Sequence, residues 1–282
     1  MKKLTALLMG TAMVLSLAAC GGSASSAASS EAASSEAASS EETSEAAAEE
    51  TTDEAAALTT VNAGKLTMST NAAFPPYEMT TDSGDFEGID IEVAGAIAEK
   101  LGLELQVDDM EFDAALLSVQ QGKADIVMAG VTVTDERKAV MDFSDSYATG
   151  IQSIIVPNDS DIASPDDLAG KTIGTQRGTT GYIYCSDDFG DENVVAYDDG
   201  LTAVQALNNG QVDAVVIDNA PAQEFVAANP GLKVLDTSYA EEDYAIGMAK
   251  GSALEDAVNK ALEELKADGT LQAIVDKYIN AN

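Results

Sequence analysis

A pattern that occurs twice in the chain constrains its fold more than any other feature of the sequence. Residues 116–127 and residues 203–215 each have the spacing of a helix, then a glycine, then a short apolar strand that opens with aspartate. Glycine commonly follows the last residue of a helix, so the two glycines mark helix ends. A helix-to-strand unit that recurs in this way predicts an α/β fold made of two similar lobes.

The duplication extends to the strands that open the two lobes. Residues 64–70 and residues 170–175 both have the pattern of a turn that enters a strand, and in the aligned copies the repeated strands end at Gly130 and Asp218. In open α/β sheets ligands bind beyond the carboxyl ends of the strands, so we expect a ligand between the lobes. The predicted limits are residues 61–148 with 241–282 for lobe 1 and residues 149–240 for lobe 2.

The other apolar patterns also fit an α/β fold. One of them predicts a helix with Asp90 as its N-cap and Gly102 just after its end. Residues 253–278 show the same period in two helices that break at Asp268-Gly269. No stretch after Cys20 is apolar enough to span a bilayer. The apolar positions of the first helix are Ala94, Ile97, Ala98 and Leu101.

Arg137 is one of only two arginines in a chain whose formal net charge is -35. It follows the apolar run 124–129, which we expect to be a buried strand, and Thr134, which stands in the position of a helix N-cap. A guanidinium beside hydroxyls and free N–H groups at a helix start can hold a carboxylate. The alternative is a surface salt bridge from Arg137 to Asp135 or Asp142, and this segment by itself leaves both open.

Several motifs follow one another in order between about residues 64 and 280. They are Phe74-Pro75-Pro76-Tyr77-Glu78, Gly88-Ile89-Asp90-Ile91-Glu92-Val93, Ala129 to Arg137, Asp142-Phe143-Ser144-Asp145, Gly178-Thr179-Thr180 and Asp218. Together they resemble the amino-acid-binding lipoproteins of polar amino acid ABC importers, family 3 of the solute-binding proteins. The resemblance implies a type II periplasmic-binding-protein fold, with crossovers near residues 147–152 and 237–244, that closes on a free amino acid.

The resemblance also implies a role for individual residues. Arg137, with the hydroxyls of Thr132 and Thr180, would bind the α-carboxylate, and Asp218 would bind the α-ammonium. This division agrees with the charges alone, because a zwitterion needs one buried cation and one buried anion. The implied ligand-binding residues are Asn71, Phe74, Phe112, Ala129, Gly130, Thr132, Arg137, Gln176, Thr179, Thr180 and Asp218.

The side chain of the amino acid is less well determined by the sequence. Phe74 and Phe112 resemble the aromatic or apolar residues that flank the side chain of the bound amino acid in the family. Asn71 stands where several relatives have aspartate, and Gln176 stands where a glutamine-binding relative has lysine. Glu78 is either an anion for a basic side chain or a structural partner in its turn, and we expect a polar or basic amino acid rather than an acidic one. The second arginine, Arg177, is expected to lie at the rim among acidic residues.

The first 20 residues resemble a bacterial lipoprotein signal. Lys2 and Lys3 precede the apolar run Leu4 to Leu17 and the sequence Leu17-Ala18-Ala19-Cys20. The resemblance implies cleavage before Cys20, lipidation of its sulfur and attachment to the outer face of a membrane. Residues 21–60 consist of Ala, Ser, Thr and Glu, with two glycines, one Asp and Leu58, and they include no basic residue. This composition predicts a disordered acidic tether.

Composition narrows the range of functions further. The strongly acidic charge and the absence of a basic patch argue against nucleic acid. Without histidine, and with Cys185 as the one cysteine left after Cys20, we expect no metal, no cofactor and an inert thiol. We expect a monomeric receptor that delivers its amino acid to a permease and an ATPase. The alternatives are an enzyme similar to cyclohexadienyl dehydratases on the same fold, and a surface adhesin or sensory module.

Overall fold

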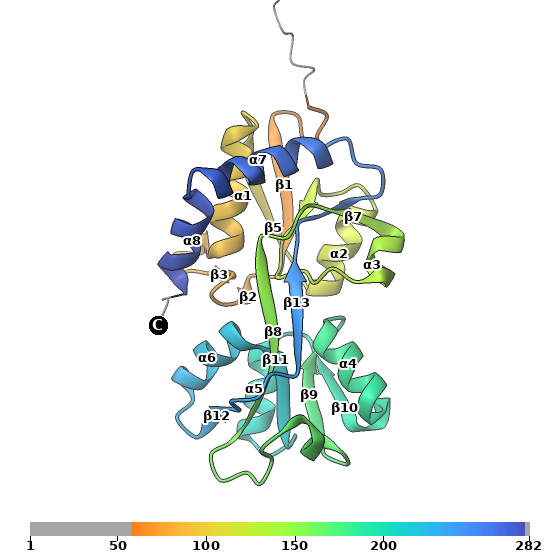
Figure 1. Ribbon diagram of the computed structural model, residues 1–282, viewed down its shortest axis with the longest axis vertical. Helices are drawn as coiled ribbons and strands as arrows, with labels where there is room; N and C mark the ends of the chain where they lie inside the picture. Colours follow the sequence, from red (N-terminus) through yellow and green to blue (C-terminus); the bar gives the residue numbers. More distant parts are fainter. Residues whose placement is uncertain (1–57, 280–282) are drawn as a thin grey trace, which may run out of the picture. The chain divides into compact units, whose positions relative to one another are not determined.

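The computed structural model describes residues 58–279. The predicted signal peptide, the lipidation site Cys20 and nearly all of the predicted tether lie outside these described residues. Within residues 58–279 no helix has both the length and the apolar character needed to cross a bilayer. The described part contains two open sheets with helices packed on them, and two long strands run from one sheet to the other (Figure 1).

The first sheet holds the amino-terminal segment and takes back the carboxyl-terminal one. Its strands lie in the order β5-β1-β6-β14-β7, and the carboxyl-terminal helices α7 and α8 pack against α1. A small sheet of β2, β3 and β4 lies beside it. The bounds are β1 Lys65–Thr70, β2 Ala73–Phe74, β3 Glu78–Thr80, β4 Phe86–Glu87, α1 Ile89–Lys100, β5 Glu104–Asp109, α2 Phe112–Gln120, β6 Ile126–Val127, α3 Asp135–Val140, β7 Met141–Phe143, β14 Gly247–Ala249, α7 Glu255–Ala267 and α8 Thr270–Tyr278.

The second sheet is built from the middle of the chain. Its strands lie in the order β10-β9-β11-β8-β12, with β13 paired to the other part of β8. The bounds are β8 Ala148–Pro157, η1 Pro165–Leu168, β9 Ile173–Gln176, α4 Thr180–Phe189, η2 Asp191–Asn193, β10 Val194–Tyr197, α5 Gly200–Asn208, β11 Ala214–Asp218, α6 Asn219–Ala228, β12 Leu232–Val234 and β13 Ala240–Tyr244.

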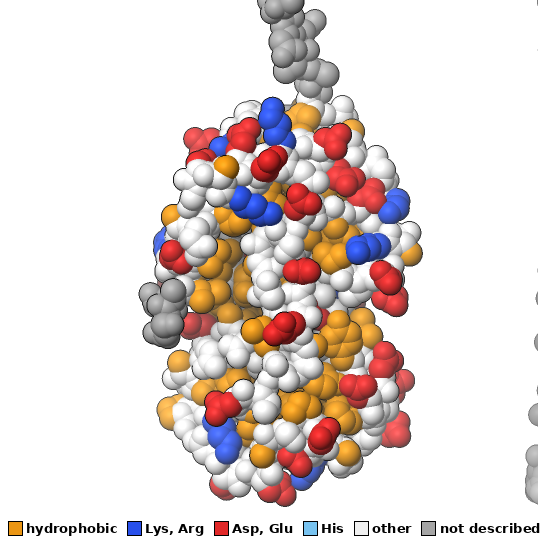
Figure 2. Space-filling view, viewed as in Figure 1, with side chains coloured by type: hydrophobic (Ala, Val, Ile, Leu, Met, Phe, Trp, Pro, Cys, Tyr) orange, Lys and Arg blue, Asp and Glu red, His pale blue; other side chains and the backbone are white. Residues whose placement is uncertain are grey.

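Two antiparallel strands connect the sheets. β8 and β13 pair from Ala148 opposite Tyr244 to Gln152 opposite Ala240. They confirm the predicted α/β fold with two lobes and two crossovers, and Figure 1 shows both strands between the lobes. The limits of the lobes, 61–148 with 241–282 and 149–240, stay our proposal. Figure 2 shows acidic side chains spread over this face of both lobes and fewer basic ones, in keeping with the net charge.

The internal repeat has a structural cause. Each repeated strand opens with an aspartate whose carboxylate accepts a hydrogen bond from a backbone N–H at the neighbouring parallel strand. The Thr67 N–H donates to Asp125, and the Thr172 N–H donates to Asp213, both at 2.8 Å. In return, the backbone carbonyls of Thr67 and Thr172 accept hydrogen bonds from the backbone N–H groups of Asp125 and Asp213. The glycines that end the repeated helices have φ of 66° and 67°, which glycine adopts at little cost. Each copy of the motif therefore fastens its strand to the neighbouring parallel strand, β6 to β1 and β11 to β9.

The start of α1 differs from its prediction, and its end confirms it. Gly88, not Asp90, is the N-cap, and Asp90 lies in the first turn of the helix, fully buried. Asp90 does not cap the helix because its carboxyl oxygens accept hydrogen bonds from the Gly130 N–H and the Tyr147 hydroxyl. Gly102 follows the helix with φ of 69°, as expected. The apolar run 124–129 is buried, but only its central residues form the strand β6.

The carboxyl-terminal prediction is also confirmed. α7 and α8 are two helices, and they break at Asp268-Gly269 because Gly269 has the left-handed conformation, with φ of 82°. Their apolar faces join the main hydrophobic core through residues such as Leu262 and Ile274. The end of the described chain is therefore packed on the first lobe, beside α1.

Candidate ligand-binding site

The predicted site residues come together in one cavity between the lobes. All eleven residues predicted to bind ligand line it, and Glu78 lines it as well. The space between these residues is about 320 Å³, which includes space open to solvent. Their role in binding is our proposal, but their convergence from strand ends, loops and helix starts of both lobes is a property of the fold. The lining residues are Asn71, Phe74, Glu78, Phe112, Ala129, Gly130, Thr132, Arg137, Gln176, Thr179, Thr180 and Asp218.

The cationic end of the cavity is Arg137. Its helix begins as predicted, with the Thr134 side chain accepting a hydrogen bond from the Arg137 backbone N–H. The guanidinium is buried and donates to the carbonyl of Thr132 at 2.8 Å and to that of Gly178, on the other lobe, at 3.2 Å. It also lies over the Phe112 ring, 5.4 Å from its centre. Neutral acceptors and a ring face thus hold the cation without neutralising it.

The alternative interpretation of Arg137 as a surface salt bridge is wrong. Asp142 instead forms an ion pair with Lys250 at 2.6 Å, and no ion pair of Arg137 occurs among the described residues. Burial lowers the pKa of Arg137, and the negative charge of Glu242 opposes that shift. Because the ordinary pKa of arginine is so high, the guanidinium remains a cation at physiological pH. A buried guanidinium without an acidic partner is suited to a carboxylate ligand.

The anionic end contains Asp218, the last residue of β11. Its side chain is buried and accepts a hydrogen bond from the hydroxyl of Tyr244, on the crossover strand β13. Burial raises the pKa of Asp218 to about 7, and the charge of Glu242 adds to the rise. The Asp218 carboxyl group therefore gains or loses its proton near neutral pH. A nearby cation would stabilise its ionised form.

Glu78 is a second carboxyl group at this cavity. It lies on β3, is fully buried, and its carboxyl group lies within hydrogen-bond reach of the Asp90 carboxyl group. Burial raises its pKa well above the ordinary value, and the charge of Asp90 raises it further. Two buried carboxyl groups side by side disfavour each other's ionisation, and a cation in the cavity would favour it.

Asp90 supports the site from behind. Its two carboxyl oxygens accept hydrogen bonds from the Gly130 N–H at 2.9 Å and from the Tyr147 hydroxyl at 2.7 Å. Burial raises the pKa of Asp90 to about 6. Gly130 lines the cavity and Tyr147 precedes the crossover strand β8, so Asp90 ties the cavity wall to the crossover.

Polar side chains of the two lobes touch across the cavity. The amide of Gln176 donates to the side-chain oxygen of Asn71 at 2.8 Å, and the hydroxyls of Thr132 and Thr180 lie 3.3 Å apart. Thr179 is the N-cap of α4, and its hydroxyl accepts from the backbone of that helix. These contacts bring the first turn of α4 to the same cavity as Arg137.

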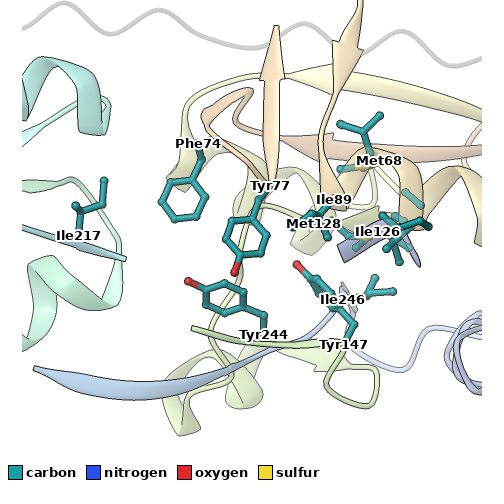
Figure 3. Close-up of a cluster of buried hydrophobic side chains, with 14 of the residues drawn as sticks. Met68, Phe74, Tyr77, Ile89, Ile126, Met128, Tyr147, Ile217, Tyr244 and Ile246 are labelled. Carbon is teal, nitrogen blue, oxygen red and sulfur yellow. The ribbon is translucent and has the colours of Figure 1, made fainter. Parts of the chain in front are cut away.

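Aromatic rings form the wall on the side of the first lobe. Phe74 stacks on Tyr77, with ring centres 5.7 Å apart, and Tyr77 meets the edge of Tyr244 at 5.3 Å. In Figure 3 the hydroxyl end of Tyr77 points toward Tyr244. Gly130 makes this packing possible, since a Cβ there would lie 2.8 Å from the Phe74 ring.

Sequence reasoning missed several residues at or behind the site. Tyr244 and Glu242 lie on the second crossover, and Gln152 lies on the first, where its amide donates to Glu242 at 2.9 Å. Nothing in their local sequence distinguishes them from ordinary strand residues. The one signal was the predicted crossover itself, because residues of both crossovers must pass the cavity. They act through contacts that only the paired strands create.

Two minor predictions concern residues outside the cavity. Arg177 is half exposed and lies 3.6 Å from Asp198, at a shallow hollow of the rim that Glu111 also lines. Cys185 is buried, and burial raises its pKa to about 12, which leaves it an inert thiol as expected. Between residues 58 and 279 no group of three or more acidic, cysteine or histidine side chains is arranged to hold a metal ion.

Comparison with known proteins gives a consistent picture. The family described as bacterial extracellular solute-binding proteins, family 3, matches residues 66–281. The L-cystine-binding protein TcyJ of Escherichia coli is 33% identical over 223 residues, covering 78% of this chain and 84% of TcyJ. The arginine-binding extracellular protein ArtP of Bacillus subtilis is 34% identical over 224 residues, covering 76% of this chain and 86% of ArtP.

A solved structure agrees with these relatives. It is the arginine-, lysine-, histidine-binding protein ArtJ of Geobacillus stearothermophilus, with a TM-score of 0.74 and 34% identity. The match covers 77% of this chain and 96% of the ArtJ chain. The likeness therefore includes both lobes and the cavity between them.

Proposed function

The chain belongs to family 3 of the bacterial extracellular solute-binding proteins, and on this premise we propose that its cavity binds a free L-amino acid with a cationic side chain. The protein is an extracytoplasmic substrate-binding protein of an ABC transporter for amino acids. Relatives named for arginine, histidine and cystine leave the particular amino acid open. The charges that line the cavity support a basic one.

The observation that carries the proposal is the charge balance of the cavity. It is lined by one cation, Arg137, and by two carboxyl groups, Asp218 and Glu78. A basic amino acid carries the opposite set, with one carboxylate and two cations. Arg137 would take the α-carboxylate and Asp218 the α-ammonium, which leaves Glu78 for the side chain. Because an unpaired buried charge is costly, a ligand that pairs all three charges is favoured over one that pairs two.

Other amino acids would pair these groups less completely. Aspartate or glutamate would bring a second carboxylate close to Glu78, and like charges at short range repel. A neutral amino acid such as glutamine leaves Glu78 without a cation, so Glu78 would have to remain protonated, as its raised pKa permits. We therefore expect arginine and lysine to bind more tightly than glutamine, and glutamine more tightly than glutamate.

Screening of ligands tests this order directly. The melting temperature of the purified protein is measured with each of the twenty amino acids, because a ligand that binds only the folded state raises it. Calorimetric titrations with arginine, lysine, glutamine and glutamate then give the affinities. Tighter binding of glutamate or aspartate than of arginine would overturn the proposal. Incubation should leave the bound amino acid with its mass unchanged, whereas conversion would support the dehydratase-like alternative.

We further propose that the protein is a monomer, anchored through a lipid on Cys20, that delivers its amino acid to a permease driven by an ATPase. The sequence around Cys20 supports the anchor, and the family supports the transporter. A Cys20→Ser variant should appear in the medium or remain unprocessed. If it stayed on the membrane after a wash with high salt, the anchor would have to lie elsewhere.

A further inference from the structure

We propose that Tyr244 and Gly150, which lie on the two crossover strands, position Asp218 to bind the ammonium group of the ligand. The inference rests on the proposed function, which assigns the ammonium group to Asp218. It adds two residues that do not line the ligand cavity and act through Asp218.

The path of the Tyr244 side chain follows from the strand order. β8 lies between β13, which carries Tyr244, and β11, which ends at Asp218. Tyr244 pairs with Ala148 and Asp218 pairs with Gln152, so the tyrosine must cross β8 diagonally to reach the carboxylate. It crosses at Gly150, which lies midway between these two partners on the same face of the strand. Its hydroxyl then donates to a carboxyl oxygen of Asp218.

Gly150 provides the space for this crossing. A Cβ at this position would lie 2.4 Å from two carbons of the Tyr244 ring and 2.5 Å from its hydroxyl oxygen. Such distances are far shorter than van der Waals contact, so a larger residue would have to displace the ring. Glycine is required at position 150 because the Tyr244 ring, which comes from the neighbouring strand, occupies the space that a Cβ would fill.

The Tyr244 ring is fixed on its other sides. It is fully buried, and the edge of its ring meets Tyr77 with the two ring planes at 74°. Its backbone carbonyl accepts a hydrogen bond from the Tyr147 N–H at 2.9 Å. Burial raises the pKa of the Tyr244 hydroxyl well above its ordinary value, and the charge of Asp218 raises it further, so the group stays a donor. Tyr244 is thus a rigid donor aimed at one carboxyl oxygen of Asp218.

The hydroxyl affects both the direction and the ionisation of Asp218. A hydrogen bond to a carboxylate favours its charged form, whereas burial and the negative charge of Glu242 oppose it. Loss of the hydroxyl would leave Asp218 harder to ionise and free to turn away from the ammonium group. The titratable and charged groups that act on Asp218 are Tyr244 and Glu242 on β13, Arg137 on α3, Glu78 on β3 and Tyr77 before β3.

The Tyr244→Phe variant tests the role of the hydroxyl. It keeps the ring and its packing and removes one oxygen atom. We expect the affinity for arginine at pH 7.5 to fall about 10- to 150-fold, the range found for a hydrogen bond to a charged group. We also expect the pH below which affinity declines to move upward, because the pKa of Asp218 rises. A purely structural role would not move this pH.

The Gly150→Ala variant tests the crossing without touching the tyrosine. The added methyl group should displace the ring and reproduce both effects of Tyr244→Phe. The matched control is Gly231→Ala in the same lobe, where a Cβ has open space and φ lies outside the left-handed region. Circular dichroism and melting curves establish that each variant is folded, and calorimetry with arginine between pH 5.5 and 8.5 gives the affinities.

The outcomes separate this inference from the proposed function. Weaker binding and a raised pH midpoint in both variants, with Gly231→Ala unchanged, would support the inference. It is overturned if Tyr244→Phe or Gly150→Ala binds as the wild type at every pH while Asp218→Asn loses binding. If the wild type binds no amino acid, or Asp218→Asn binds normally, the proposed function itself fails.

Discussion

The two ends of the ligand cavity differ in how their charges are held. At one end Arg137 donates to backbone carbonyls and lies over an aromatic ring, and its charge persists at any physiological pH. At the other end Asp218 and Glu78 are buried acids with raised pKa values, and Glu78 lies beside the carboxyl group of Asp90. The cationic end is nearly complete within the protein, whereas the anionic end is suited to completion by ligand cations.

The contrast grows out of the duplicated motif. Gly130 and Asp218 stand at equivalent places after the repeated strands, one in each lobe. Gly130 leaves room for Phe74 and donates its N–H to Asp90, while Asp218 places a carboxylate in the cavity. The same local fold thus contributes backbone in one lobe and charge in the other. Four experiments test how far the two ends differ.

The largest effect is expected at the cationic end. Arg137→Ala should lower the affinity for arginine about 30- to 4000-fold, because the α-carboxylate would be buried without its cation, at a cost of about 2–5 kcal/mol. Arg177→Ala, which removes the half-exposed arginine of the rim, is the matched control and should bind normally. Calorimetry on both variants is the measurement. Near-normal affinity in Arg137→Ala would remove this residue from the site.

The next effect concerns Glu78 at the anionic end. Glu78→Gln should lower the affinity for arginine about 10- to 150-fold, since a charged hydrogen bond is lost, and should leave glutamine binding within a few-fold of normal. Glu87→Gln, at an exposed position of β4, is the control. Titration of both ligands into both variants gives the comparison. An equal loss for arginine and glutamine would show that Glu78 supports the fold of the cavity and does not select the side chain.

The pH dependence should come from the anionic end alone. Arginine binding needs Asp218 and Glu78 ionised, so its affinity should fall as pH decreases through about 7, by at most about tenfold per pH unit for each carboxyl group that gains a proton. The free protein should respond in the opposite direction. Because the folded pKa values of Asp218 and Asp90 are raised, to about 7 and about 6, the folded state binds more protons than the unfolded chain between about pH 4 and 7.

The free energy of unfolding of the free protein should therefore fall as pH rises through this window and level off above it. Urea titrations at half-unit intervals measure that free energy, and calorimetry over the same interval measures the affinity. Constant affinity from pH 5.5 to 8 would mean that the anionic end does not titrate on binding, and the contrast between the two ends would then be lost.

The smallest effect is expected where the lobes touch away from both charged ends. Gln176→Ala removes the hydrogen bond to Asn71 and should weaken binding about two- to tenfold, as for a single neutral hydrogen bond. Gln205→Ala, at an exposed position of α5, is the control.

X-ray scattering should show a smaller radius of gyration with ligand than without in the wild type and in Gln205→Ala. An unchanged radius in the wild type would contradict closure of the lobes on the ligand.

Local patterns account for the parts of the structure that could be predicted. The repeat, the N-cap Thr134 and the glycines after the helices depend on residues a few positions apart. The sequence also indicated a cation in Arg137 and an anion in Asp218. The error at Asp90 has a physical cause, since its carboxyl oxygens accept from Gly130 and Tyr147, far away in the chain, and not from the helix start.

The sequence by itself predicted two lobes and a ligand beyond the strand ends, because periodicity and capping act over short distances, and its resemblance to the family implied one charge for each end of a zwitterion. Only the tertiary structure decided that Glu78 lies buried beside Asp90, that Asp90 holds Gly130, and that Tyr244 crosses Gly150 to reach Asp218. These features depend on burial and on contacts between strands far apart in the chain. The sequence gives the position of a carboxyl group but not its surroundings. Only the fold determines whether water, a hydroxyl group or a ligand contacts it.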